Sequence, residues 1–471
     1  MPEQKLQRAT LSQVAASVKT PGYTAHPTET GVLHLGLGAF HRAHQAMVFD
    51  QLLREGDSRW GIHGVGMTQP GLVNKLRAQD GLYSVRIAGA TGVEWQVPGA
   101  LWQTSVATTE RPKVLAAIAA KSTRWITLTV TEKGYTPALA QLLIDGLRLR
   151  HEAGQAGLTI ASCDNLQGNG HKLKALIHAT ASSQDKALMQ WMDAHCAFPC
   201  SMVDRIVPAA TEDVAAAAKE ALGLADDCAL STETFWEWVI EDNFVDPGDA
   251  ALLTKCGVRV TKDVHSYEEA KLRMLNGSHS AMALMGAITG RPYIASCIGA
   301  DHIREFVNRL MSREVAPHLS RTDWADYRDA LIQRFGNPYL KHSVHQIAMD
   351  SSQKIPQRWP PSVLGQMAAG QSFEHHALAA AIFLRYTLAI DEQGHAYALN
   401  DPQADSLLAI GAHQVADASD SLNALLSRTD LWGAELPHNT LWAERVAYWH
   451  DQVVHQGVDA TVKFAITLDA Q

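Results

Sequence analysis

The 471-residue sequence predicts an α/β fold in which a doubly wound parallel sheet is followed by a mainly α-helical half. Two observations carry this prediction. Short apolar runs alternate with helical patterns up to about residue 161, as in a parallel sheet whose strands are joined by helices. Helical patterns dominate from Lys172 onward, for example at 214–222 and 377–388. A chain of this length exceeds one compact core, so two or three domains are expected.

The elements of the predicted sheet follow one another along the first third of the chain. Residues 1–28 are polar and weakly periodic, which predicts an arm or a short helix. The expected strands lie at 32–35, 61–66, 83–87, 93–97, 125–130 and 158–161. The expected helices run from the turn at Gly36 through Leu53, and over 72–79 and 139–150. A polar turn at 246–249 and a shift in composition predict a first domain of residues 1–260 and a second of 261–471.

Composition and charge argue against several classes of function. Forty lysine and arginine residues against 49 aspartate and glutamate residues give a formal net charge of −9, and no basic block stands out. Neither a nucleic acid nor a membrane is therefore expected as a partner. The chain lacks the apolar run of about 18 residues that a membrane span needs, and its N-terminus lacks the apolar core of a signal peptide. Six scattered cysteines without a Cys-x-x-Cys pair predict reduced thiols and a cytoplasmic protein.

The 22 histidines raise the question of a metal site. The closest sets are His41/His44, His342/His345 and His375/His376. None of them forms a His-Glu-x-x-His motif or has a carboxylate or cysteine at ligand spacing. The pair Cys196 and Cys200 does not have a zinc spacing either. No catalytic metal is expected.

The segment after the first strand has the pattern of a pyrophosphate-binding turn. A strand, then Gly36-Leu37-Gly38, then a helix allows close backbone approach and presents amide donors at the helix N-terminus. The third glycine of the dinucleotide motif is missing, because its position holds His41. A simple strand-to-helix turn is the alternative. The acid expected after the second strand is also missing, since Thr68-Gln69 stands there. The sequence favours NAD as the cofactor and leaves NADP open.

A second pattern concerns the segment 271–280. As an α-helix with about 100° per residue, it places Asn276 about 140° and His279 about 80° from Lys271. Glu268 falls on the same side, about 60° away. A lysine can act as a general base when burial or neighbours lower its pKa toward about 7–8. The alternative is an ordinary amphipathic helix whose polar side chains point into water.

Four further groups of polar residues are candidates for function, and the first two follow strands of the expected doubly wound sheet. Asn165 follows the expected strand 158–161, as an oxyanion donor or, alternatively, as an Asx turn or helix N-cap. Glu132 follows the strand before it. Asp204 and Arg205 lie side by side in an apolar run, where a structural ion pair is the alternative. Lys354 and Arg358 flank a proline, as an anion clamp or a solvated loop.

Eight segments occur together in one order along the chain. They are Gly36–Gln45, Thr129–Tyr135, Ser162–Asn165, Met202–Ile206, Trp238–Phe244, Lys271–Ser280, Gln346–Asp350 and Gln353–Arg358. With them the chain resembles the mannitol dehydrogenase family of long-chain, metal-independent polyol and uronate dehydrogenases, and within it the fructuronate reductases. The resemblance runs from about residue 30 to about residue 390.

The resemblance implies a Rossmann-like N-terminal domain, a mainly helical C-terminal domain and a site between them. It assigns Lys271 as general acid/base, Asn165 and Asn276 as donors to one substrate oxygen, His279 as an orienting group and Glu268 as part of a proton path. The implied cofactor-binding residues are Gly36, Leu37, Gly38, Ala39, Phe40, Glu132 and Asp204. The implied substrate-binding residues are Asp204, Lys354 and Arg358.

The function expected on this resemblance is that of an NAD(P)-dependent oxidoreductase that acts on CH–OH groups. It interconverts a secondary alcohol and a ketone on an open-chain sugar derivative without a metal. D-Mannonate and D-fructuronate are the first expected pair, and a polyol 2-dehydrogenase acting on D-mannitol, D-arabinitol or a related alditol is the alternative. A dinucleotide-binding regulator and a zinc-dependent polyol dehydrogenase are further rivals. We expect a small-molecule substrate and a monomer or small homo-oligomer.

Overall fold

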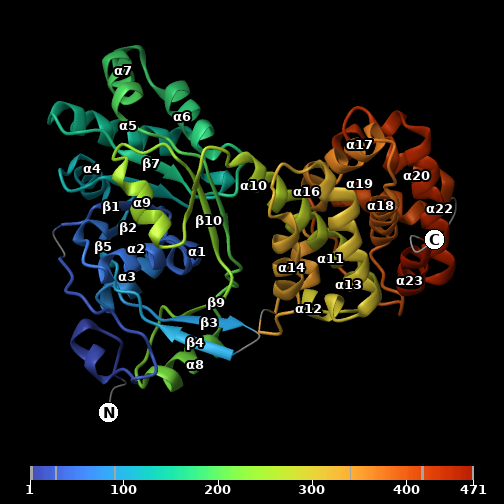
Figure 1. Cartoon of the computed structure of the whole chain (residues 1–471), viewed down its shortest axis with the longest axis horizontal. Coiled ribbons are helices and arrows are strands. Elements are labelled where there is room, and N and C mark those ends of the chain that lie inside the picture. The colour runs from blue at the N-terminus through green and yellow to red at the C-terminus, as the bar shows by residue number, and fades with distance from the viewer. Residues whose placement is uncertain (1–3, 27–28, 90–91, 340, 415–417, 469–471) are drawn as a thin grey trace. The chain divides into compact units, whose positions relative to one another are not determined.

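The computed structural model of the chain forms two compact units, residues 1–265 and residues 266–471 (Figure 1). It describes residues 4–26, 29–89, 92–339, 341–414 and 418–468. The expected N-terminal arm contains one short 3-10 helix, η1 (Arg8–Gln13), while its residues 1–3 and 27–28 lie outside the described residues. The sequence places the domain boundary after residue 260, and the structure divides the chain after residue 265.

Five parallel strands form the central sheet of the first unit, in the order β5-β2-β1-β6-β7 (Figure 1). The strands are β1 (Val32–Leu35), β2 (Ile62–Gly66), β5 (Leu101–Val106), β6 (Trp125–Leu128) and β7 (Thr159–Ser162). Leu35 is in register with Val65 on one side and with Leu128 on the other. This strand order is that of a Rossmann-like sheet. From β1 the chain adds strands on one side up to β5 and then on the other side from β6 onward, so the switch point of the sheet lies between β1 and β6.

Helices cover both faces of this sheet, which is why its inner strands read as nearly continuous apolar runs. One face carries Leu33 and Ile126, which pack against Val114 of α4 and Leu143 of α5. The other face belongs to a separate cluster that contains Phe49 of α2. The helices of this unit are α1 (Ala39–Ala43), α2 (Gln45–Arg54), η2 (Ser58–Trp60), α3 (Gly71–Ala78), α4 (Arg111–Ala119), η3 (Glu132–Gly134), α5 (Pro137–Glu152), α6 (Asn169–Thr180), η4 (Ser183–Asp185), α7 (Lys186–His195), α8 (Glu212–Leu222) and α9 (Gly248–Lys255). The predicted doubly wound architecture is confirmed.

Two small sheets complete the first unit, in the orders β11-β10-β8 and β4-β3-β9. Their strands are β3 (Val85–Gly89), β4 (Gly92–Gln96), β8 (Ser201–Asp204), β9 (Leu230–Glu233), β10 (Glu237–Glu241) and β11 (Arg259–Thr261). The expectation of a mostly helical chain from Lys172 onward is therefore wrong for the part before residue 265. Strands β3 and β4 overlap the expected strands 83–87 and 93–97, but they form a small sheet with β9 instead of joining the parallel sheet. Strands β8 to β11 are three to five residues long and pair with segments that are distant in the sequence. Periodicity along the chain does not reveal such short, tertiary pairings.

The second unit is mainly helical, as the sequence predicts. Its helices are α10 (His265–Ala270), η5 (Lys271–Asn276), α11 (Gly277–Thr289), α12 (Ile294–Ile298), α13 (Asp301–Arg309), η6 (Leu310–Val315), η7 (Ala316–His318), α14 (Trp324–Phe335), α15 (Val344–Ala348), α16 (Ser351–Arg358), α17 (Pro360–Ala368), α18 (Glu374–Tyr386), α19 (Ala404–His413), α20 (Ala418–Leu426), α21 (Thr429–Trp432), η8 (Leu436–His438), α22 (Thr440–Gln456) and α23 (Val458–Leu468). Helix α10 begins at the last residue of the first unit. Among the residues that the structure describes, none of the helices combines the length and apolarity needed to cross a bilayer.

Helices α11 and α18 form the centre of the second unit. Twelve of the 13 residues of α11 are buried, and this helix contacts α12, α15, α16 and α18. A β-carbon at Gly286 would lie 2.6 Å from Cys297 of α12 and 2.6 Å from Val344 of α15. The missing side chain thus lets both helices approach α11. A helix that is buried on all sides in this way is a core helix.

A buried carboxylate explains the adjacent histidines at the start of α18. Glu314, which lies 61 residues before His375, accepts hydrogen bonds from the backbone N–H groups of His375 and His376 and contacts both rings at 2.6–2.7 Å. Burial by itself raises the pKa of Glu314, but the charges and hydrogen bonds of the two histidines outweigh it and lower the pKa to about 2. The partner of the two histidines is therefore a carboxylate 61 residues away in the sequence, and it caps α18.

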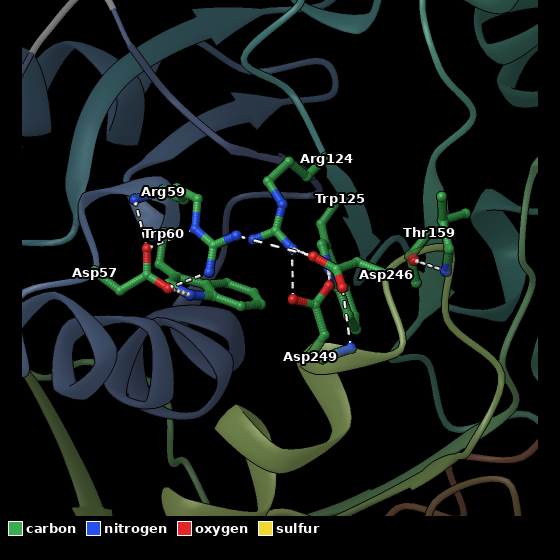
Figure 2. Close-up of polar contacts among 10 residues, drawn as sticks. Asp57, Arg59, Trp60, Arg124, Trp125, Thr159, Asp246 and Asp249 are labelled. Carbon is green, nitrogen blue, oxygen red and sulfur yellow. Dashed lines mark hydrogen bonds and ion pairs between the residues drawn. The ribbon is translucent and has the colours of Figure 1, made fainter.

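A polar network ties the segment after β10 to the amino end of the central sheet (Figure 2). Asp249 of α9 is 1% exposed and accepts hydrogen bonds from Arg124 and from the indole N–H of Trp125, the latter at 2.8 Å. Asp246 contacts the same Arg124 at 3.1 Å, but its side chain is 48% exposed. The polar turn that the sequence marks as a boundary is thus fixed to strand β6.

Replacing Asp249 by Asn should lower the free energy of unfolding of the first unit by about 2 kcal/mol, because a buried, charge-assisted pair of hydrogen bonds is weakened. The matched variant Asp246→Asn should cost less than about 1 kcal/mol, since that ion pair is exposed to solvent. Urea-induced unfolding of both variants measures the difference. Equal losses in the two variants would contradict this account of the network.

Candidate functional site

The turn after β1 brings the chain too close to the neighbouring strand for any residue but glycine. Gly36 has a φ of +97°, and a β-carbon there would lie 2.2 Å from the carbonyl oxygen of Thr129. The N–H groups of Gly36 and Leu37 both donate to the carbonyl of Val65, at 2.9 Å. Gly38 is extended, with a φ of −132°, and precedes α1. This turn lies where the strand order reverses, which is where doubly wound sheets bind dinucleotides.

Two stacked histidines take the place of the close helix–strand contact that a third glycine usually permits. The rings of His34 and His41 lie 3.3 Å apart between centroids and are nearly parallel. Burial lowers the pKa of His34 to about 3 and lowers that of His41 as well, so both rings are neutral. His34 contacts the hydroxyl groups of Thr127 and Thr129, each at 2.9 Å. His41 therefore fits at the position of the missing third glycine, because its ring stacks on that of His34.

The helix after this turn is interrupted. Helix α1 contains Ala39 and Phe40 and ends at Ala43, and α2 begins at Gln45 after a break at His44 with φ −124° and ψ −91°. Phe40 is half-buried, and its ring stacks on His44 with centroids 5.0 Å apart. The sequence predicts one helix through this region, and the structure has two. Phe40 is thereby held beside the glycine turn.

The turns after β6 and β7 are joined by a carboxylate that sequence reasoning overlooked. Asp164 accepts a hydrogen bond from the N–H of Thr131 at 2.7 Å and from the hydroxyl of Tyr135 at 3.2 Å. Burial raises the pKa of Asp164 to about 6. Thr131 has a φ of +64°, a left-handed conformation that threonine rarely adopts. Strained backbone of this kind is concentrated at functional sites, and exposed Glu132 follows directly.

Asn165 is exposed in the turn after β7. The helix N-cap alternative for this residue is wrong, because α6 begins at Asn169 and its N-cap is Gly168. The side chain of Asn169 fixes the turn instead, since it donates to the carbonyls of Asp164 and Ser201 at 3.0 and 2.7 Å. The amide of Asn165 is thus carried by a turn that neighbouring residues hold in place.

Asp204 and Arg205 do not play equivalent roles. Asp204 is 4% exposed at the end of β8, in register with Glu237 of β10. The guanidinium of Arg205 donates to the backbone carbonyls of Ala43 and Glu233, and burial lowers its pKa to about 10. Arg205 therefore connects the end of α1 to β9, which is a structural role.

In the second unit, the segment that carries Lys271 is helical but is not an α-helix throughout. Residues 271–276 form a π-helical turn, and the N–H of Gly277 donates to the carbonyl of Leu272, five residues back. A turn closed by such bonds contains more residues than the 3.6 of an α-helix. Lys271 and Asn276 therefore lie closer to one face than the 140° expected for an α-helix. Both residues are half-buried, and π turns occur frequently at functional sites.

Arg358 and Lys354 belong to helix α16, so the expectation of a solvated loop is wrong. One nitrogen of Arg358 donates to the carbonyl of Asn276 at 3.0 Å and to the hydroxyl of Ser280 at 2.7 Å. Burial lowers the pKa of Arg358 to about 10, so it stays charged at neutral pH. The ammonium of Lys354 donates to the carbonyl of Ile347, and its pKa is lowered by burial and by the charge of Arg358.

The remaining predicted residues of the second unit lie on either side of the π turn. His279 is 6% exposed on α11, and its ring contacts those of Phe335 and His342, with centroids 4.6 and 5.5 Å apart. Glu268 is half-buried on α10. The structure thus brings Lys271, Asn276 and Arg358 together around one turn.

Comparisons with known proteins agree on one family. The family model of the mannitol dehydrogenase Rossmann domain matches residues 30–251, and that of the mannitol dehydrogenase C-terminal domain matches residues 263–454. D-Mannonate oxidoreductase of Escherichia coli K12 is 37% identical, over 93% of this chain and 96% of its own. Mannitol 2-dehydrogenase of Phaeosphaeria nodorum is 33% identical, over 97% and 85%. The solved Pseudomonas fluorescens mannitol 2-dehydrogenase, a ternary complex with NAD and D-mannitol, superposes with a TM-score of 0.83 at 29% identity, over 98% and 99% of the two chains.

The two glycines of the turn should respond differently to a β-carbon. Gly36→Ala should lower the free energy of unfolding by about 3 kcal/mol, from the left-handed backbone and from the clash with Thr129. In Gly38→Ala, the new β-carbon meets only the carbonyl oxygen of Gly36 at 3.6 Å, so stability should stay within about 0.5 kcal/mol of wild type. Chemical unfolding checks both values, and a stable Gly36→Ala protein would contradict the tight approach.

Proposed function

The chain belongs to the mannitol dehydrogenase family, whose members are oxidoreductases acting on CH–OH groups, and from this premise we propose its substrate, cofactor and catalytic residues. The reaction is the interconversion of a secondary alcohol and a ketone on an open-chain sugar derivative. D-Mannonate and D-fructuronate are the proposed pair. The observation that supports this proposal most is the π turn, which carries Lys271 and Asn276 and is held by Arg358.

NAD is the proposed cofactor. The residues at the switch point of the sheet fit a dinucleotide, because Gly36 and Gly38 leave the backbone accessible and α1 begins directly after them. Thr68 and Gln69, just past β2, are exposed and neutral, so neither side chain offers a positive charge to the 2′-phosphate of NADP. The related Pseudomonas fluorescens structure is described as a complex with NAD. When bound, the nicotinamide accepts or delivers the hydride.

Lys271 is the proposed general acid/base. In alcohol oxidation it takes the hydroxyl proton, and in ketone reduction it returns a proton to the oxygen. The π turn places Lys271 and Asn276 near one face of the helix, and Glu268, on the preceding turn, is assigned to the proton path. The chemistry needs no metal in this scheme, because an ammonium group and amide donors stabilise the charge on oxygen.

Asn165 and Asn276 are each proposed to donate a side-chain amide to the substrate oxygen. Such donors stabilise negative charge as it develops on the oxygen. Arg358 supports this role because it fixes the backbone of Asn276 through that residue's carbonyl. His279 is assigned an orienting role, since it is buried and packed against Phe335 and His342.

The proposal that the substrate is a sugar acid rests on the two cationic side chains of α16. Lys354 and Arg358 are one helical turn apart, and both are partly buried, an arrangement that suits a carboxylate. A polyol 2-dehydrogenase is the second candidate, for a specific reason. One nitrogen of Arg358 is already used by Asn276 and Ser280, and fewer donors then remain for a substrate carboxylate.

Replacing Lys271 by Ala should lower turnover about 10³-fold or more, since the proton acceptor is lost, and should leave dinucleotide affinity nearly unchanged. Exposed Lys262 provides a control, because Lys262→Ala removes the same charge on the segment that precedes α10. Steady-state kinetics and a dinucleotide titration followed by fluorescence measure the two effects. Near-wild-type turnover in Lys271→Ala would overturn the assignment.

A panel of D-mannonate, D-mannitol and D-arabinitol, each with NAD⁺ and with NADP⁺, tests the substrate and cofactor proposals. Turnover should be highest with D-mannonate and NAD⁺. Lys354→Met should raise the KM for D-mannonate and leave that for D-mannitol unchanged, because only the acid carries a carboxylate. Turnover of D-mannitol without turnover of D-mannonate would favour the polyol 2-dehydrogenase. A protein that binds dinucleotide without turning over any substrate would be a regulator instead.

A further inference from the structure

We propose that His171, Cys200 and Glu241 form a binding site for one divalent transition-metal ion, with Zn²⁺ as the ion that fits best. One ligand atom from each side chain lies within 4.8 Å of the other two. Among the described residues, this is the one group of three such side chains with that spacing. The site lies within the first unit and is independent of the proposed hydride transfer, because none of its residues is assigned to that chemistry.

Two of the ligands are placed by the pairing of β8 with β10. Ser201 is in register with Ile240, and the next pair outward continues the ladder. There the N–H of Glu241 donates to the carbonyl of Cys200 at 2.9 Å. The N–H of Cys200 in turn donates to Oε2 of Glu241 at 3.0 Å. These bonds fix the carboxylate beside the thiol and leave Oε1 of Glu241 for an ion.

The third ligand comes from the first turn of α6. The side chain of Asn169 exchanges hydrogen bonds with the backbone of Ser201, at 2.7 and 2.9 Å. Gly170 packs so closely on the segment before Cys200 that a β-carbon there would lie 2.5 Å from the carbonyl oxygen of Phe198. The helix is thus locked against the strand, and His171, one residue further on, is held near Cys200 and Glu241.

The chemistry of the donor set selects the class of metal. A thiolate, an imidazole and a carboxylate suit Zn²⁺, whereas Mg²⁺ and Ca²⁺ prefer ligands that are all oxygen. Tetrahedral zinc at ordinary bond lengths separates its ligand atoms by about 3.3–3.8 Å. The limit of 4.8 Å therefore requires only small side-chain movements on binding. All six cysteines, each of them among the described residues, carry thiols rather than disulfides.

The burial of the three side chains defines how the ion enters and what completes its coordination. Cys200 is buried, Glu241 is half-buried and His171 is exposed. An ion can enter from the side of His171, and water can occupy the fourth position. The bound ion would join α6 to the β8–β10 pair. Its expected consequence is a more stable first unit, because an ion that binds the folded state stabilises it.

Titration of metal-free protein with ZnCl₂ and with CoCl₂ tests the site. The wild type should bind one ion per chain, and its Co²⁺ form should show the near-ultraviolet absorption of a thiolate–metal bond. Cys200→Ser and His171→Ala should each weaken binding more than about 100-fold, because even residues outside the coordination sphere contribute 10–100-fold. Zn²⁺ should raise the Tm of the wild type and should not raise that of Cys200→Ser.

Two controls separate this site from general binding to cysteine and histidine. Cys196→Ser removes a thiol four residues before Cys200, and His178→Ala removes a histidine of the same helix that contacts Asp193 at 3.0 Å. Both should bind like the wild type. The proposal is overturned if the wild type binds no ion, or if Cys200→Ser binds as tightly as Cys196→Ser. Circular dichroism confirms that each variant is folded.

Discussion

The close parallel pairing of β1 with β6 is the constraint on which the first unit depends. It brings the backbone of Gly36 so near to Thr129 that a β-carbon would lie 2.2 Å from its carbonyl oxygen. Because all five strands are parallel, the polar turns that carry Glu132 and Asn165 follow strands that end at the same edge of the sheet. The parallel pairing of the apolar strands thus determines at which edge of the sheet the candidate functional residues of this unit lie.

In the second unit, a local change of helix geometry positions the residues proposed for catalysis. A π turn at 271–276 interrupts a run of α-helix, and Arg358 from α16 binds the carbonyl of Asn276, the last residue of that turn. The turn changes the angle between Lys271 and Asn276 without breaking the helix. It lies directly before α11, the most buried helix of the unit, so a rigid core supports the residues proposed for catalysis.

The sequence predicts those parts of the molecule that depend on local patterns. The apolar strands β1, β2, β6 and β7, the Gly36 turn and the helix around Lys271 all follow from runs of adjacent residues. Strand β5, the short strands β8 to β11 and the π turn were not predicted, because they depend on pairing and packing between distant segments. For the same reason, the sequence does not show that Asp164 binds the N–H of Thr131 or that Glu314 is the partner of His375. The catalytic roles come from the family resemblance and stay predictions.

The central proposal is that the side-chain amides of Asn165 and Asn276 stabilise the charge that develops on the substrate oxygen. A double-mutant cycle with Asn165→Ala and Asn276→Ala, measured as kcat/KM on the substrate that is turned over, tests it most directly. Each single change should cost about 10²–10³-fold. The double variant should lose much less than the product of the two losses, because groups that act as a unit are not additive. Losses that multiply, or a single variant with near-wild-type kcat/KM, would contradict the claim.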